Sequence, residues 1–314
     1  MIQRVVLVAP RGFCAGVVRA VDIVERALQV YGAPVYVRRP IVHNPHVVAR
    51  LAAKGAIFVQ EIDEVPPGAL VIFSAHGVAP SVWQAAAARG LDVLDATCPL
   101  VTKVHREVRR YLEEGYEVVL IGHAGHDEVV GTLGQAPGRI HLVERPEDVE
   151  RLVIANSQRV ACVTQTTLSP EDVAPVMAAL ERRFPGLVRP STADICFATR
   201  NRQDAVRWLA HRVDVVLVLG DTSSSNAQRL REVAARTGTP AYLVGRITEL
   251  DPAVLAHARV LGLTAGASTP EELVHEAVTH FRAQGAVVEE VTLQVEHTWF
   301  PLPDFATHRA GMAS

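Results

Sequence analysis

Three cysteines that lie far apart in the sequence have the residue type and the placement to bind a metal cluster. Cys14, Cys98 and Cys196 are separated by 98 − 14 = 84 and 196 − 98 = 98 residues, and each stands between a strand-like and a helix-like stretch. Three thiolates that met would hold an iron–sulfur cubane and leave its fourth iron without a protein ligand. Such an iron is a Lewis acid for a substrate oxygen and a source of electrons. The alternative is that these cysteines are small core residues, because free cysteine is often buried.

The cysteine pattern gives no support to two common metal sites. The sequence has no Cys-x-x-Cys pair, so neither a ferredoxin-type run nor a zinc site is indicated. The fourth cysteine, Cys162, lies inside the apolar run 160–163. We therefore expect Cys162 to be a buried strand residue.

Two serine-rich turns are candidates for an anion site. Residues 223–226 stand just before a helix predicted over 227–236, and residues 268–271 open a helix predicted over 270–284. Free N–H groups and the helix dipole make such N-termini suitable for phosphate. Because serine, threonine and asparagine are also the preferred N-cap residues, simple capping stays open for each turn.

Histidines on other loops favour the anion-site interpretation. His43, His76 and His126 can donate to phosphate oxygens and take up positive charge near neutral pH. Two serine-rich turns and three imidazoles together predict a phosphorylated or diphosphate ligand. The sequence has no Walker A motif and no G-x-G-x-x-G motif, so it gives no support to a nucleotide ligand.

A candidate proton donor lies close to one of these histidines. Glu128 follows His126 by two residues in a glycine-bounded loop. A carboxyl near an open iron could deliver protons to a leaving hydroxyl. A lone acid is more often a solvated surface residue or a first-turn residue stabilised by the helix dipole. Thr166 and Thr167 could relay a proton or orient a substrate hydroxyl, or could belong to a helix cap.

Apolar runs without alternation predict parallel strands that are covered on both faces. Amphipathic stretches lie between them, and this alternation of strands and helices argues for α/β layers. The predicted strands cover 5–9, 70–73, 118–121, 160–163, 215–219, 241–244 and 260–263, with a further strand in the tail over 287–295. The predicted helices cover 17–31, 81–89, 101–114, 170–184, 202–211, 227–236 and 270–284.

Polar loops follow five of the predicted strands. Because ligands of open α/β sheets bind outside the carboxyl ends of strands, we expect these loops to share one site. The loops are residues 74–77, 122–128, 164–167, 220–226 and 264–268.

The composition indicates a folded protein without a nucleic-acid footprint. The chain has 314 residues, 49% hydrophobic and 21% charged, with a formal net charge of −3. No apolar run reaches the roughly 18 residues that a membrane span needs, and the first residues resemble a strand rather than a signal peptide. We expect a cytoplasmic protein that binds neither nucleic acid nor membrane.

Ten motifs spread over the chain give it a specific resemblance. They are PRGFCAGV (10–17), VHN (42–44), FSAHGV (73–78), DATCPLVTKVH (95–105), GHAGH (122–126), TQTTLS (164–169), DIC (194–196), NRQ (201–203), SSN (224–226) and TAGAS (264–268). With these motifs the chain resembles the LytB-type 4-hydroxy-3-methylbut-2-enyl diphosphate reductase family, over residues 10 to about 284.

The resemblance implies three similar α/β domains in a trefoil-like arrangement around a central [4Fe–4S] cluster. The implied domains are 16–98, 99–193 and 194–281 with 1–15, followed by a C-terminal tail over 282–314. The three cysteines Cys14, Cys98 and Cys196 match the cluster ligands of the family, and one iron stays open. The chain is implied to be a monomer, with reduced ferredoxin or flavodoxin as its electron donor.

The resemblance also implies roles for the polar side chains. Glu128 matches the family's proton-delivering acid, and Thr166 the threonine near the substrate hydroxyl. The implied reaction removes this hydroxyl as water and yields isopentenyl and dimethylallyl diphosphates. The residues expected to hold the substrate are His43, His76, His126, Thr166, Thr167, Ser224, Ser225, Asn226 and Ser268.

The chain departs from the family pattern in places. Asp127 stands where the family usually has proline, and a second carboxylate there could raise the pKa of Glu128 or alter the loop. Residues 220–223 also differ from the expected form, and the segment 299–303, a possible lid, is only loosely similar.

Two other functions stay open: a non-catalytic iron–sulfur sensor, and an iron–sulfur lyase that needs no reductant.

Overall fold

The computed structural model describes residues 1–189 and 194–305, which form two compact units. The first unit comprises residues 1–17, 43–47 and 197–299, and the second comprises 18–42, 48–196 and the chain after residue 299. The predicted boundary between the second and third domains, at 193/194, and the end of the predicted tail include residues that lie outside the described ranges. Each unit is described by itself.

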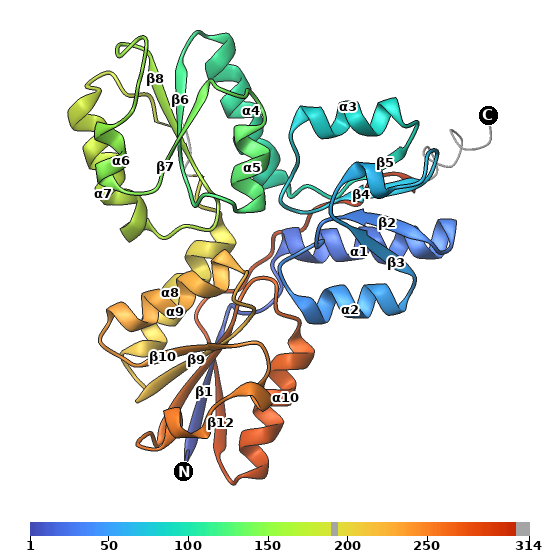
Figure 1. Ribbon diagram of the computed structural model, residues 1–314. Helices are drawn as coiled ribbons and strands as arrows, with labels where there is room; N and C mark the ends of the chain where they lie inside the picture. The colour runs from blue at the N-terminus through green and yellow to red at the C-terminus, as the bar shows by residue number, and fades with distance from the viewer. Residues whose placement is uncertain (190–193, 306–314) are drawn as a thin grey trace. The chain divides into compact units, whose positions relative to one another are not determined.

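The first unit contains a five-stranded parallel sheet in the order β10-β9-β11-β1-β12 (Figure 1). Its central strands come from the two ends of the chain, because β1 pairs with β11 from Arg4↔Val260 to Leu7↔Leu263. The strands are β1 (Arg4–Ala9), β9 (Val215–Leu219), β10 (Ala241–Val244), β11 (Val260–Ala265) and β12 (Val287–Thr292). The helices are α8 (Phe197–Ala210), α9 (Ser225–Arg236) and α10 (Glu271–Ala283), with short 3₁₀ turns at Ile247–Glu249 and Pro252–Leu255.

Helices cover both faces of this sheet, which explains its unbroken apolar strands. Val6 and Val8 face α8 and α9, where they join a cluster with Leu209 and Leu230. The alternate side chains of β1 face α10 and pack in a second cluster that includes Phe281. A three-layer core results, and the carboxyl end of β1 leads directly into the loop that carries Cys14.

The second unit contains two smaller parallel sheets. The first has the order β3-β2-β4-β5, and α3 packs on it through Ala86 and through Trp83, whose ring lies edge-on to Phe73 at 4.9 Å. The strands are β2 (Val35–Arg38), β3 (Ala56–Val59), β4 (Leu70–Phe73) and β5 (Asp92–Asp95). The helices of this part of the chain are α1 (Ala15–Tyr31), α2 (Pro45–Ala53) and α3 (Pro80–Ala88), with a 3₁₀ turn at Ile62–Glu64.

The second sheet of this unit has the order β7-β6-β8, with helices on both faces (Figure 1). Val104 and Val108 of α4 pack with Leu120 on one face, while Leu180 of α7 packs with Ile121 on the other. The strands are β6 (Glu117–Ile121), β7 (Ile140–Val143) and β8 (Val160–Thr164). The helices are α4 (Pro99–Glu113), α5 (Asp127–Leu133), α6 (Pro146–Glu150) and α7 (Pro170–Arg183).

The α/β class and the parallel sheets are confirmed, and each predicted strand or helix overlaps an observed one. Cys162 is a fully buried residue of β8, also as predicted. The sequence analysis did not identify β2, β3, β5, β7, α2, α5 and α6. The domain boundaries and the arrangement around a central cluster stay predictions.

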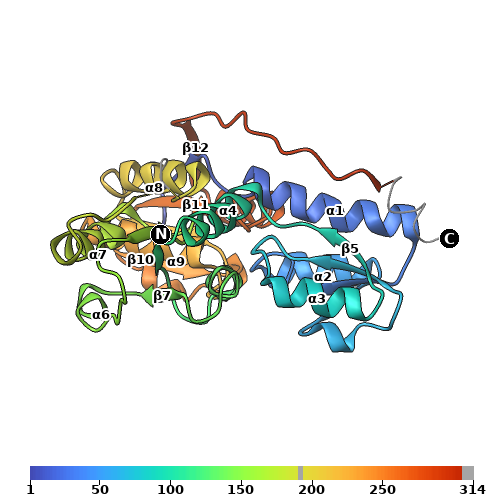
Figure 2. The ribbon, with the colours of Figure 1, turned by 90° about the horizontal axis from the view of Figure 1, so that it is seen from above.

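The chain after β12 is irregular over residues 293–304, and Figure 2 shows it as an extended segment. Among the described residues, the helices are all too short or too polar to cross a membrane.

Candidate functional site

Glu128 and Thr166 form a buried pair in the second unit. The Thr166 amide donates to Glu128 Oε1 at 2.7 Å, and the Thr166 hydroxyl donates to Oε2 at 2.8 Å. Glu128 is the second residue of α5 and is only 3% exposed, so it is not the solvated surface acid that its sequence context also allowed. The carboxyl is held in one orientation because both its oxygens accept a hydrogen bond from the same residue.

Burial raises the pKa of Glu128 to about 7. The hydrogen bonds from Thr166 lower this pKa in part, and the charge of Asp194 raises it. Asp127, which the sequence left as a possible cause, is not among the causes of this shift. Asp127 instead forms an ion pair with Arg39, which compensates its charge. A carboxyl with a pKa near neutrality can hold a proton and release it, as a general acid requires.

His126 and His76 lie beside this acid. His126 is the N-cap of α5, and its Nδ1 accepts a hydrogen bond from the Glu128 amide at 3.2 Å. This bond assigns the ring proton to Nε2 in the neutral form. The His76 ring lies edge-on to His126 with centroids 5.9 Å apart, and His76 Nδ1 is 3.3 Å from the Ser74 hydroxyl. The two imidazole rings therefore lie together, and His126 contacts the backbone of the acid.

Two of the predicted ligand cysteines belong to the same unit. Cys98 is the N-cap of α4, and its amide donates to Ala75 O, next to His76. The Cys196 amide donates to the Thr166 carbonyl at 3.0 Å. Thr166 thus contacts Glu128 with its amide and side chain and the Cys196 segment with its carbonyl. The acid and the Cys196 segment are fixed by one residue.

A buried ion pair braces the Cys196 segment. Lys103 of α4 donates to Asp194 Oδ1 at 2.9 Å, and Asp194 Oδ2 accepts from the Thr164 amide at the end of β8. The Asp194 side chain is fully buried. Since Cys98 is the N-cap of α4, this pair ties the two cysteine-bearing segments to each other.

The serine-rich turns come together in the first unit. The Ser268 hydroxyl donates to the His43 carbonyl at 3.0 Å and lies 3.4 Å from the Ser224 hydroxyl. Asn226 Oδ1 accepts from the Ala267 amide at 2.8 Å. Ser224 is also the N-cap of α9, so the capping and anion-binding interpretations are compatible at this turn. Ser225 is the first residue of α9 and is half-buried.

Cys14 lies beside these turns. Its amide donates to the Ala267 carbonyl at 3.3 Å, and the Gly12 amide donates to the Ala265 carbonyl at 3.1 Å.

The candidate residues therefore form two groups, one in each unit. His43, Ser224, Asn226, Ser268 and Cys14 form the first group, and His76, His126, Glu128, Thr166, Cys98 and Cys196 form the second. That both groups share one pocket stays a prediction. Thr167 lies next to Thr166, and its hydroxyl accepts from Gln165.

The chemistry of the donor set fits an iron–sulfur cluster. None of the four cysteines forms a disulfide; Cys14, Cys98 and Cys196 are half-buried, whereas Cys162 is buried in β8. Each of the three directly precedes a helix, and the positive end of a helix dipole favours negative charge. Soft thiolates at such positions suit iron–sulfur clusters. That the three thiols meet at one cluster stays a prediction.

The sequence analysis assigned no role to four charged residues that the structure places around the cysteines. Lys103 and Asp194 brace the Cys196 segment. Arg202 contacts the Cys14 loop, and Glu296 contacts Arg202. Arg202 had a usable signal, because it interrupts an otherwise apolar helix face between Ala198 and Ala205. Glu296 had none, because its partner is 94 residues away.

These sheets and the grouped acid, imidazole and thiol side chains are those of an α/β enzyme. The family described as LytB protein matches residues 5–282 of the chain. The chain is 57% identical to 4-hydroxy-3-methylbut-2-enyl diphosphate reductase of Bordetella pertussis over 300 residues, 95% of this chain and 92% of the relative. It is 56% identical to the reductase of the same name from Burkholderia pseudomallei over 302 residues, 96% of either chain.

Solved structures agree with these relatives. The E-1-hydroxy-2-methyl-but-2-enyl-4-diphosphate reductase from Plasmodium falciparum superposes with a TM-score of 0.94 at 35% identity, covering 100% of this chain and 99% of that one. A second structure, named (E)-4-hydroxy-3-methyl-but-2-enyl diphosphate reductase, gives 0.65 at 34% identity, with 90% and 100% covered. The chain belongs to the LytB family, whose curated relatives here are reductases.

Proposed function

We propose that this chain reduces 4-hydroxy-3-methylbut-2-enyl diphosphate to isopentenyl and dimethylallyl diphosphates. The reaction consumes two electrons and two protons, breaks the allylic C–O bond and releases the oxygen as water. The substrate identity rests on the relatives' names and on the ten sequence motifs. The observation that carries the proposal in the structure is the buried Glu128–Thr166 pair, because a leaving hydroxyl needs a proton at neutral pH.

Glu128 is the proton donor in this proposal. With a pKa of about 7, a substantial fraction of the carboxyl is protonated at neutral pH. Its two hydrogen bonds to Thr166 hold it in place, so that little motion is needed before the transfer. The Thr166 hydroxyl orients the acid and lies next to the position we assign to the substrate hydroxyl.

In this proposal the polar side chains predicted from the sequence bind the diphosphate. His76 and His126 supply ring N–H donors, and Ser224, Asn226 and Ser268 supply hydroxyl and amide donors. Charge-assisted hydrogen bonds to phosphate oxygens are stronger than neutral ones, so anchoring the diphosphate fixes the allylic end of the substrate. His43, Thr167 and Ser225 complete the proposed contacts.

Cys14, Cys98 and Cys196 would hold a [4Fe–4S] cluster. When bound, such a cluster would supply the two electrons and a Lewis acid for the substrate hydroxyl, chemistry that no side chain provides. The proposed electron donor is a reduced ferredoxin or flavodoxin. A monomer in the cytoplasm is part of the same proposal.

An anaerobic assay tests the function. The protein is reconstituted with iron and sulfide, the iron and sulfide are quantified, and then a low-potential donor and the allylic diphosphate are added. We expect isoprenoid diphosphates whose formation depends on the reductant. Glu128→Gln should bind the substrate and turn over very slowly, and wild-type turnover in this variant would rule out the role of Glu128.

The other outcomes select the competing functions. A cluster without turnover would indicate the sensor, and turnover without reductant would indicate the lyase. A protein that takes up no iron would return the three cysteines to ordinary core residues.

A further inference from the structure

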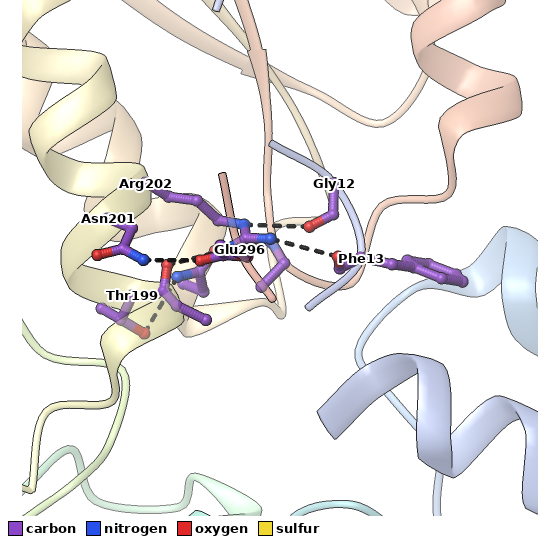
Figure 3. A network of polar contacts seen from close by, with 9 residues as sticks. Gly12, Phe13, Thr199, Asn201, Arg202 and Glu296 are labelled. Carbon is purple, nitrogen blue, oxygen red and sulfur yellow. Dashed lines mark hydrogen bonds and ion pairs between the residues drawn. The ribbon is translucent and has the colours of Figure 1, made fainter. Parts of the chain in front are cut away.

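Arg202 is a buried arginine that contacts the loop before Cys14 (Figure 3). It is 1% exposed, and its side chain points from α8 toward this loop. Arg202 Nε donates to the Gly12 carbonyl at 3.1 Å and Nη2 donates to the Phe13 carbonyl at 3.3 Å. One guanidinium therefore restrains the two peptide groups that directly precede Cys14.

The charge of Arg202 is compensated from the C-terminal segment. Nη1 lies 3.1 Å from each carboxylate oxygen of Glu296, which follows β12 in the irregular chain. Asn201 on the same helix donates to Glu296 Oε1 at 2.9 Å (Figure 3). Because a buried charge is costly unless it is paired, Arg202 depends on Glu296 to remain in place.

The loop has little other freedom at this point. Gly12 has φ +62°, and a Cβ there would lie 3.2 Å from the Thr269 carbonyl. The Gly12 and Cys14 amides already donate to Ala265 and Ala267. The donors of the loop are thus satisfied by the β11 end, and two of its acceptors are satisfied by Arg202.

We propose that the Arg202–Glu296 pair positions Cys14 as a metal ligand, and that the C-terminal segment is needed for this reason. The proposal rests on the proposed function in one respect, the assignment of Cys14 as a cluster ligand. Glu296 is a positioning residue, because it acts through Arg202 and does not touch Cys14. The pair also gives the C-terminal segment a role that does not require residues 299–303 to be a lid.

The test compares the thiols within one protein. In metal-free Glu296→Ala, the rate of alkylation of each cysteine is measured by mass spectrometry of its peptide. We expect Cys14 to react about tenfold faster than in the wild type, as expected when a charge-assisted hydrogen bond that restrains its loop is lost. Cys98 and Cys196 should keep their wild-type rates, because the hydrogen bonds that the structure describes for Glu296 are with Asn201 and Arg202 of α8.

The iron-loaded protein gives the second readout. After anaerobic reconstitution with iron and sulfide, an iron chelator is added and the loss of cluster absorbance is followed. We expect Glu296→Ala to lose iron about tenfold faster, by the same loss of restraint. Glu289→Ala is the control, since Glu289 makes only an exposed contact with Arg4 at 3.9 Å.

Milder variants keep the proposal testable if Glu296→Ala folds poorly. Asn201→Ala removes one hydrogen bond to Glu296, and Glu296→Gln keeps an oxygen acceptor without the charge. Both should raise the alkylation of Cys14 selectively and by less than Glu296→Ala. An unchanged Cys14 rate, or equal increases at all three cysteines, would overturn the proposal. These rates do not depend on turnover, so they separate this inference from a failure of the proposed function.

Discussion

Replacing Glu128 by glutamine should change how the stability of the second unit depends on pH. Glutamine has nearly the same shape, and its amide oxygen can accept from the Thr166 amide as Glu128 Oε1 does. Burial moves the pKa of Glu128 from 4.5 to about 7. A difference of about 2.5 pKa units corresponds to about 3 kcal/mol, since one unit corresponds to 1.36 kcal/mol.

The direction of the effect follows from proton binding. Between pH 4.5 and about 7 the folded protein holds the Glu128 proton more tightly than the unfolded chain does. The wild type therefore loses stability as the pH rises through this window, and Glu128→Gln does not. Relative to the wild type, the variant should gain up to about 3 kcal/mol between about pH 5 and pH 8.

Hydrogen exchange is a suitable assay because the protein has more than one compact unit and need not unfold in one step. Exchange of the β6 and β8 amides is compared between the variant and the wild type at each pH, so that the intrinsic exchange rate cancels. The ratio of the protection factors, variant over wild type, should increase by about two orders of magnitude from about pH 5 to pH 8. Glu113→Gln, at an exposed glutamate at the end of α4, is the control. A ratio that stays constant with pH would refute the buried, proton-holding state of Glu128.

Three further changes test other parts of the second unit. Burial lowers the pKa of His105 from 6.5 to about 4, so the buried imidazole is neutral near pH 7. The stability that this neutral side chain contributes is lost as the pH drops from 6.5 toward 4, because the unfolded chain binds the proton more readily. His105→Leu should remove this acid sensitivity in the same exchange assay, and an unchanged profile would contradict it. Lys103→Met leaves the buried Asp194 carboxylate without its cation and should lower the free energy of unfolding by about 3 kcal/mol. Adding Asp194→Asn should recover most of this loss, as read from thermal melting. Gly77→Ala should lower the melting temperature by the equivalent of about 1–3 kcal/mol, because Gly77 has φ +77° and a Cβ would lie 2.8 Å from His105 Cε1; an unchanged melting temperature would contradict this.

The strands that could be predicted are those with a continuous apolar run in the sequence. Val215–Leu219 is an unbroken run of Val and Leu, and the structure buries all five residues. The strands that were missed have four residues each, and polar residues interrupt most of them, as at Asp92–Asp95. Such short segments become strands through pairing with a neighbour, which is tertiary information.

The candidate site shows the same limit. The sequence placed His126 and Glu128 in a loop and left a first-turn helix position open for Glu128. A seven-residue helix begins at Asp127, so Glu128 lies in its first turn, and His126 caps it. Glu128 and Thr166 were both candidates, yet their contact joins residues 38 apart in the sequence. Local patterns selected the candidate side chains. The charged partners that hold them, such as Arg202 and Glu296, depend on long-range packing that no local pattern contains.

The position of β1 has a consequence for how the chain is assembled during synthesis. β1 leaves the ribosome first, but its two neighbours β11 and β12 begin at Val260 and Val287. At roughly 5–20 residues per second, the 260 − 4 = 256 residues from Arg4 to Val260 take on the order of tens of seconds to translate. The Cys14 loop follows β1 and cannot reach its final form before these last strands emerge. If Cys14, Cys98 and Cys196 hold the proposed cluster, iron delivered before these strands emerge would meet a Cys14 loop that has not yet reached its final form.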